Sequence, residues 1–197
     1  MAASARIHPL LRAKDIEALP EERRVHALDS ASIRHTRSLG DAVGLGTIGI
    51  HLVRLEQGRT SSVHHFHHHD EEWVYILSGR GLAEIGDEKF DVGAGDFMGF
   101  VAGSLPHSLT NPHAQDLVYL VGGNRLPFDV CDYPRLRMRR YRLSGTNEYV
   151  SLDALVKTGT KAPGKSEDES PLKKSGNESP LKKAGTKAPK KTGTTAP

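Results

Sequence analysis

Short runs of apolar or alternating residues, separated by turn residues, fill the middle of the chain. Such runs are typical of strands, and turn signals such as Gly86-Asp87 and Asn111-Pro112 lie between them. The predicted strands are 47–55, 72–78, 81–85, 97–101, 105–109 and 117–121. Regular short spacing of this kind predicts an all-β fold, closed into a barrel or folded into a sandwich.

The two flanks of this region are less regular. Residues 15–28 have a helical composition but carry Pro20 in the middle, so we expect a short helix or an arm there. Residues 128–155 alternate Leu, Met and Tyr with arginines between Arg135 and Arg142. That stretch predicts either an edge strand whose arginines face solvent or the rim of a site.

The composition changes at Lys157. From there onward the chain has no aromatic, Val or Ile residue and consists mainly of Lys, Pro, Gly, Ser, Thr and Ala. Such a segment cannot bury enough apolar surface to offset the entropy lost on ordering. We therefore expect three parts: an N-terminal arm over 1–24, one β domain over 25–156 and a disordered tail over 157–197.

The predicted tail also holds the positive charge. It has ten lysines and four acidic residues, a net +6, whereas the whole chain carries +3, which leaves −3 for the remainder. Near-repeats place Ser170 and Ser179 in Ser-Pro-Leu-Lys sequences that resemble sites of proline-directed kinases. Because the tail lacks arginines and aromatic residues, a solubilising role is favoured over contact with nucleic acid. A chromatin-associated role for the whole protein through this tail is a weaker alternative.

One stretch carries the candidate chemistry. Residues 58–79 contain five histidines and two glutamates and end in a predicted strand. Alternate side chains of an extended chain share a face, so His65 and His67 point the same way. Glu72 begins the strand that follows, and His107, in another short predicted strand, is the best fourth candidate. Three imidazoles and one carboxylate that converge on one point suit a divalent first-row metal ion.

These residues resemble the two sequence motifs of the cupins. The ligand part of the first motif is matched by His65, His67, Glu72 and Gly79, with six residues rather than five between Gly58 and His65. The second motif is matched by Gly95, Gly103, His107 and Asn111, with Val101 in place of the usual proline and three residues rather than two before His107. The resemblance covers roughly residues 47–121. It implies a double-stranded β-helix jelly-roll barrel that holds a metal ion with the four ligands named above.

Other polar residues of the stretch have simpler interpretations. His64, His68 and His69 are expected to belong to a solvated loop or to scavenge metal non-specifically. Glu71 also lies within the spacing that the motif allows, but the distance to the next glycine favours Glu72. Asn111 either orients a ligand from the second shell or caps the turn formed with the following proline.

Alternation along residues 72–78 separates two faces. It places Val74 and Ile76 on the ligand face and Trp73 and Tyr75 on the opposite face. We expect the second pair to pack or to join two copies of the chain, so that the protein is a homodimer.

Two classes of function fit these features. The first is a metal-dependent enzyme acting on a small organic molecule, and an oxygenase-type oxidoreductase holding Fe, Mn, Ni or Zn is the leading prediction. Isomerases and decarboxylases, which the resemblance also implies, are alternatives, as is a barrel that only binds or senses a small molecule. A proton-transfer group near the metal would separate the classes, and the flanking strands offer His51, Arg54, Glu56 and Tyr119.

Remaining features bound the setting. The single cysteine, Cys131, excludes an internal disulfide, and no apolar run approaches the length of a membrane helix. Charged residues and a proline interrupt the N-terminal region, so no signal peptide is expected. We expect no membrane partner and a cytoplasmic location, with the nucleus as the alternative.

Overall fold

The computed structural model describes residues 8–156 together with 158 and 159. The predicted disordered tail and its two Ser-Pro sites lie outside the described residues, apart from those two positions. The fold below therefore concerns the N-terminal arm and the β region.

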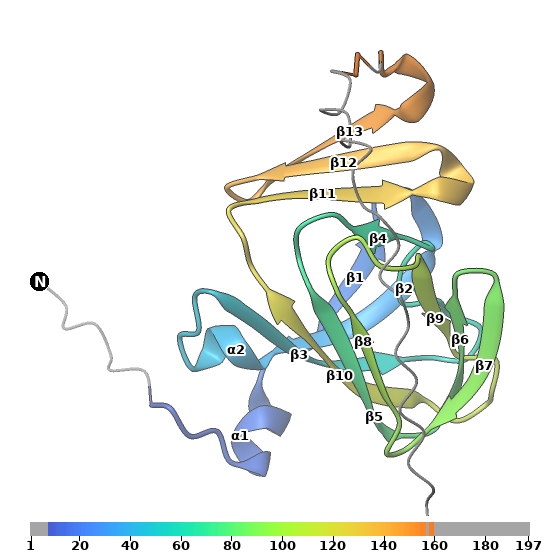
Figure 1. The fold of residues 1–197 in the computed structure, drawn as a ribbon. Helices are drawn as coiled ribbons and strands as arrows, with labels where there is room; N and C mark the ends of the chain where they lie inside the picture. Colours follow the sequence, from blue (N-terminus) through green and yellow to red (C-terminus); the bar gives the residue numbers. More distant parts are fainter. Residues whose placement is uncertain (1–7, 157, 160–197) are drawn as a thin grey trace, which may run out of the picture. The chain divides into compact units, whose positions relative to one another are not determined.

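The largest layer is an antiparallel sheet of six strands (Figure 1). Its order is β1 (Glu22–His26), β2 (Asp29–Ser38), β3 (Ile48–Leu55), β10 (Leu117–Asn124), β5 (Glu72–Ser78) and β8 (Phe97–Phe100). β10 lies at the centre and pairs with β3 along its whole length, from Leu117 with Leu55 to Asn124 with Ile48. Strands far apart in sequence thus become neighbours, as the crossing connections of a jelly roll require.

Two smaller sheets complete the β region. One has the order β7 (Glu88–Gly93), β6 (Arg80–Ile85) and β9 (His107–Thr110). The other has the order β13 (Thr146–Ser151), β12 (Met138–Leu143), β11 (Phe128–Tyr133) and β4 (Phe66–His67). Residues 58–65 join these sheets, because they bond to β9 through bridges at Thr60 and His65 and continue into β4. The three- and four-stranded sheets therefore act as one second layer.

Helices are short and peripheral. They are α1 (Ala13–Ala18), α2 (Leu39–Ala42) and the 3-10 turns η1 (Pro134–Leu136) and η2 (Leu152–Ala154). Among the described residues, none of the helices has the length and apolar character needed to cross a membrane.

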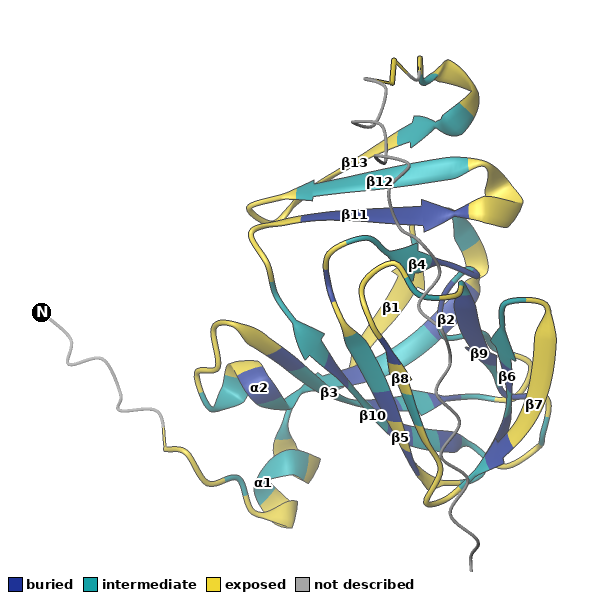
Figure 2. Ribbon diagram, in the orientation of Figure 1, coloured by how far each residue is buried: buried dark blue, intermediate teal, exposed yellow. Residues whose placement is uncertain are grey.

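The hydrophobic core lies on the inner face of the large sheet and against β6, β7 and β9. Figure 2 shows buried stretches along β3, β5, β10 and β11, whereas β7 is mostly exposed. The members of the core cluster are Val53, Leu55, Val74, Ile76, Ala83, Val92, Leu109, Leu117 and Tyr119. Each fully buried Val, Leu or Ile contributes about 1.5–3 kcal/mol, so this cluster holds the strands that carry the polar site.

The all-β fold and the jelly-roll architecture expected from the sequence are confirmed. The six predicted strands correspond to β3, β5, β6, β8, β9 and β10, and β5 has the predicted bounds. Val74 and Ile76 are buried while Tyr75 is 39% exposed, as the alternation predicts. Tyr75 lies opposite the exposed Phe97 on the outer face, and the pairing of two copies there stays a prediction.

Both flanks contain more strand than the sequence suggested. The short helix is present as α1, but β1 follows it and pairs with β2, so the expected boundary between residues 24 and 25 falls inside a strand of the large sheet. Downstream, β12 is not an edge strand, because it lies between β11 and β13. Charged residues dominate β1 and hide any alternation there, whereas β12 shows the predicted alternation and differs from the prediction only in lying between two strands.

Gly79 forms the tight connection between β5 and β6. Its φ is +79°, a left-handed conformation that side chains with a Cβ disfavour. A Cβ at this position would also collide with the backbone oxygen of Asp116. Only glycine fits here without strain.

We expect Gly79→Ala to lower the free energy of unfolding by about 2 kcal/mol or more, because the strain of positive φ adds to the backbone collision. Gly46→Ala is the matched control, since a Cβ there meets no atom within 4 Å, and a change below about 0.5 kcal/mol is expected. Chemical denaturation of both variants measures the difference. Equal stability of the two would show that the turn tolerates a side chain.

Candidate metal centre

His65 and His107 face each other across two antiparallel segments. The His65 N–H donates to the His107 carbonyl at 3.1 Å, and the His107 N–H donates to the His65 carbonyl at 2.8 Å. Two residues that exchange both bonds project their side chains from the same face. Their rings lie 4.9 Å apart. Backbone pairing thus fixes the relative position of two predicted ligands that are far apart in sequence.

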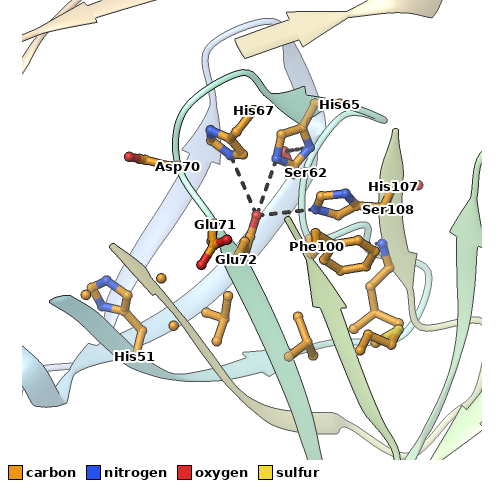
Figure 3. Close-up of a pocket in the computed structure, with 18 of the residues that line it drawn as sticks. His51, Ser62, His65, His67, Asp70, Glu71, Glu72, Phe100, His107 and Ser108 are labelled. Carbon is orange, nitrogen blue, oxygen red and sulfur yellow. Dashed lines mark hydrogen bonds and ion pairs between the residues drawn. The ribbon is translucent and has the colours of Figure 1, made fainter. Parts of the chain in front are cut away.

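The carboxylate of Glu72 is the point on which three histidines converge (Figure 3). Its Oε2 lies 3.3 Å from Nε2 of His107, 3.6 Å from Nε2 of His67 and 3.8 Å from Nε2 of His65. Glu72 is the first residue of β5, and His67 lies in β4 two residues after His65. The structure therefore brings together all four residues that the spacing singled out.

Hydrogen bonds at the far side of the rings set the direction of the lone pairs. Nδ1 of His65 lies 2.8 Å from the Val63 carbonyl, and Nδ1 of His67 lies 2.7 Å from Oδ2 of Asp129. Both partners accept, so Nδ1 carries the proton of the neutral ring and the Nε2 lone pair faces Glu72. In His107 the weaker contact of Nδ1 with the Leu105 carbonyl, at 3.4 Å, has the same sense.

The protonation of the cluster suits a metal ion. Burial lowers the pKa of His65 to about 4, so its ring is neutral near pH 7. For Glu72, burial raises the pKa, but interaction with His107 and His65 outweighs it and holds the pKa well below its usual range. Neutral imidazole and ionised carboxylate are the forms that bind metals.

The donor set fits a divalent ion on two further grounds. Lone pairs aimed at a carboxylate oxygen repel it unless a cation lies between them. Metal–ligand bonds of about 2.1 Å place neighbouring donors roughly 3.0–3.4 Å apart, close to the distances found around Glu72. His65, His67, Glu72 and His107 are therefore the residues that would hold the ion.

Cys131 forms a second candidate group with His65 and His67, since their donor atoms all lie within 4.8 Å of one another. Its thiol is fully buried, and burial raises the pKa of the Cys131 thiol to about 12. A protonated thiol is a poor ligand. The group built on Glu72 is the better metal site.

Asp129 supports the site, and sequence reasoning missed it. The side chain is fully buried, its Oδ2 accepts from His67, and its Oδ1 accepts from the backbone N–H groups of His69 and Asp70. Burial raises the pKa of Asp129, but the hydrogen bond and charge of His67, the N–H of Asp70 and the charge of Arg142 together outweigh it and bring the pKa to about 2. The available signal was an acidic residue inside the apolar run that became β11.

Asn111 serves the turn rather than the ligands. Its Nδ2 donates to the carbonyls of Leu55 and Gln115, each at 2.9 Å, and its Oδ1 accepts from the N–H of His113. These are all backbone partners. Of the two roles left open by the sequence, the structure supports turn capping. Among the described residues, Asn111 makes no hydrogen bond to a predicted metal ligand.

The remaining histidines of the stretch are more ordered than a solvated loop. His64 is only 7% exposed and lies 3.4 Å from the Ser108 hydroxyl, while Nε2 of His68 lies 3.1 Å from Oδ2 of Asp132. The expectation of a solvated loop is therefore wrong for His64. Phe100 stacks on the His107 ring at 3.5 Å between centroids and holds that ring flat against β8.

A cavity of about 270 Å³ opens beside the four predicted ligands. Of the four candidate proton-transfer residues, His51 and Tyr119 line this cavity. Arg54 instead takes part in an ion-pair network with Glu21 and Asp116 on the outer side of the sheet, and Glu56 belongs to the same network. Only the first two can therefore reach a bound small molecule.

We expect the full-length protein, purified without an affinity His-tag, to carry about one equivalent of Fe, Mn, Ni or Zn. A His65→Ala, Glu72→Ala double variant should lose it, because two of the four donors are gone. A His68→Ala, His69→Ala double variant is the control and should retain the metal. Elemental analysis gives the result, and equal metal in the first variant would place binding elsewhere.

Asp129→Asn is expected to weaken metal affinity by about 10- to 100-fold, because the amide no longer fixes the tautomer and direction of His67. Asn111→Ala should lower the melting temperature instead and leave metal affinity of the folded protein unchanged. Competition with a chelator measures the affinities. Similar losses in both variants would restore Asn111 to a role at the metal.

Comparison with known proteins agrees with this architecture. A family model described as "Cupin domain" matches residues 51–123. The crystal structure of a protein named "Putative sugar phosphate isomerase" from Acidithiobacillus ferrooxidans has a TM-score of 0.75 and 40% identity, over 77% of this chain and 97% of that one. A sugar phosphate isomerase of the cupin superfamily from Silicibacter pomeroyi has a TM-score of 0.66 and 28% identity, over 73% of this chain and 95% of that one.

A curated relative adds a shorter match. An uncharacterized protein of Methanocaldococcus jannaschii is 36% identical over 70 residues, which is 36% of this chain and about half, 48%, of that protein. The family model and the near full-length match to the Acidithiobacillus structure point to the same group. This chain belongs to the cupin superfamily.

Proposed function

We propose that this protein is a metal-dependent isomerase that acts on a sugar phosphate. The observation that carries the proposal is the cavity itself, because the four predicted metal ligands and His51 line one space of about 270 Å³. The names of the two similar solved structures support the same reaction and substrate class. The oxygenase-type oxidoreductase expected from the sequence gains no specific support from them, whereas the isomerase alternative does.

Interconversion of an aldose and a ketose moves hydrogen within one molecule. A base removes the proton from the carbon beside the carbonyl and returns one to the former carbonyl carbon, while a hydroxyl proton passes to the carbonyl oxygen. No external oxidant or reductant is needed. The site must therefore provide a group that polarises the carbonyl and a group that carries the proton.

The four predicted metal ligands meet the first requirement, a group that polarises the carbonyl. When bound, a divalent ion supplies Lewis-acid polarisation of an oxygen of the substrate. His65, His67, Glu72 and His107 hold the ion, and the buried wall behind them, with Phe100 stacked on His107, excludes water from that side. A cavity of this size encloses a small substrate.

His51 meets the second requirement, a group that carries the proton. It lies on β3, its Nδ1 is 3.1 Å from the Ser38 hydroxyl, and it lines the cavity on the opposite side of Glu72 from His107 (Figure 3). Burial lowers the pKa of His51, and repulsion from Arg125 and Arg24 lowers it further. The ring is therefore neutral near pH 7 and can accept a proton from the substrate. Tyr119 cannot act as the base, because burial raises its pKa to about 12.

The proposal is tested by incubating metal-loaded protein with a panel of aldose and ketose phosphates in deuterated water. Isomerisation through proton transfer produces the partner sugar and replaces a carbon-bound hydrogen with deuterium, and both changes are followed by NMR. The His65→Ala, Glu72→Ala variant is the inactive control. Absence of conversion and of deuterium exchange across the panel would contradict the proposal. Consumption of dioxygen would instead favour the oxygenase-type oxidoreductase.

We expect His51→Gln to lower kcat by about 100-fold or more without changing metal content, because the base is lost. His35→Gln, on the outer face of β2 beside Glu21 and Glu56, is the matched control and should retain activity. A variant at His51 that keeps wild-type kcat would exclude this residue as the base.

The pH profile gives an independent check on His51. The acting form is neutral, so the rate is full above the pKa of His51 and falls as the pH drops through it. Burial lowers this pKa most, Arg125, Arg24 and Arg34 lower it further and Asp41 raises it, so the acid limb should lie below the usual value of 6.5. The limb should disappear in His51→Gln, as measured by kcat/KM against pH.

A further inference from the structure

Four arginines line the cavity, and two of them are not neutralised by a close carboxylate. Arg142 donates to Asp70 at 2.6 Å, and Arg125 pairs with Asp41 at 2.5 Å. Arg34 donates instead to a backbone carbonyl, that of Ser61, at 3.0 Å. Within residues 8–156, no carboxylate oxygen lies within 4 Å of the Arg34 guanidinium. Its remaining N–H groups are available to a ligand.

Arg140 is the second under-compensated cation. Its Nη2 lies 3.4 Å from Oδ2 of Asp129, longer than the 2.7–2.9 Å typical of strong charge-assisted bonds. Its Nε is buried and has no hydrogen-bond partner among the described residues. Asp129 is already held by His67 at 2.7 Å and by two backbone N–H groups. A buried cation of this kind calls for an anion.

The register of the four-stranded sheet places Arg140 relative to the metal cluster. His67 pairs with Cys131, and Cys131 pairs with Arg140, so the three residues form one row across β4, β11 and β12. Residues paired directly across antiparallel strands project from the same face. Two strand spacings, about 10 Å, separate the backbones at the ends of the row. The two side chains project from one face and contact the same carboxylate, that of Asp129, which lies between them.

His26 adds a neutral donor to the same wall. Its Nδ1 accepts from the N–H of Leu28 at 3.1 Å, so the neutral ring carries its proton on Nε2. Burial lowers the pKa of His26, and repulsion from Arg34 and Arg140 lowers it further, so the ring is neutral near pH 7. The three side chains come from β1, β2 and β12 and all line the cavity. We call Arg34, Arg140 and His26 the arginine wall.

We propose that the arginine wall binds the phosphate group of the substrate, while the carbonyl end lies at the histidine and glutamate cluster. This inference rests on the proposed function for the identity of the substrate. Guanidinium groups bind phosphate oxygens through paired N–H bonds, and the wall and the four predicted ligands line the same cavity. The wall therefore selects phosphorylated sugars and fixes their direction in the cavity.

The test is calorimetric titration of the metal-loaded, full-length protein with inorganic phosphate at low ionic strength. Arg34→Met and Arg140→Met should each weaken binding by about tenfold or more, because each removes charge-assisted bonds. Arg23→Met, an exposed arginine on the outer face of β1, is the matched control and should bind as wild type does. Sulfate should compete with phosphate, and acetate should compete less.

Arg140 is partly buried, so Arg140→Lys accompanies Arg140→Met. The lysine keeps the positive charge but loses the paired N–H groups of the guanidinium, so phosphate binding should be intermediate. Thermal unfolding shows whether each variant is folded. Absence of phosphate binding in the wild type would overturn the inference. Binding that is unchanged in Arg34→Met and Arg140→Lys would also overturn it, and would indicate that the anion binds at the metal.

The inference and the proposed function can fail separately. Arginine-dependent phosphate binding without any isomerase activity would support the wall and reject the proposed reaction. Isomerase activity with an unchanged KM for a phosphorylated sugar in Arg34→Met would support the reaction and overturn the wall. If both hold, the arginine variants raise KM for the phosphorylated sugar more than for its unphosphorylated counterpart.

Discussion

The structure depends on one partly buried carboxylate, that of Glu72, facing three imidazoles. A carboxylate taken out of water is costly unless a cation or donor compensates it. Here His65 and His107, which are locked together by paired backbone bonds, and His67 in the neighbouring strand aim their Nε2 atoms at it, so the compensating charge would be that of a metal ion held by all four groups. Because these groups lie on separate segments, the carboxylate can be satisfied only when the two layers of the fold are closed. Folding and assembly of the candidate metal site are therefore the same event.

The inner face of the large sheet carries the hydrophobic core at one end and the polar cavity at the other. Toward one end, Val53, Leu55, Ile76, Leu117 and Tyr119 fill the space between the layers. Toward the other end, Glu72 pairs with Gly123, which in turn pairs with Gly49. Both glycines line the cavity. A Cβ at Gly123 would collide with the Glu71 carbonyl oxygen and one at Gly49 with the Arg125 side chain, so other elements already pack closely against both positions.

Local spacing singled out three of the four candidate ligands because their placement is local, whereas His107 came from the second motif. His65 and His67 share a face through strand alternation, and Glu72 opens the next strand, so a count along the chain is enough. The partners that orient them are not local: Asp129 reaches His67 from 62 positions away, and no pattern within either segment connects the two. The same limit applies to β1, whose charged residues show no apolar alternation, and to the place of β12 between β11 and β13, which its own alternation does not reveal. Asn111 illustrates the reverse case, in which a motif position proved to serve a turn.

Asp129 also connects the two halves of the cavity. Its Oδ2 lies 2.7 Å from Nδ1 of His67 and 3.4 Å from Nη2 of Arg140, so one carboxylate contacts both a candidate metal ligand and the arginine wall. The shorter bond goes to the histidine, and the arginine is left with a buried, unbonded Nε. A tighter pairing of Arg140 with this carboxylate would neutralise more of the arginine's charge and weaken its attraction for an anion. The unequal sharing of Asp129 is therefore compatible with the proposed metal site and the proposed phosphate site in one small cavity.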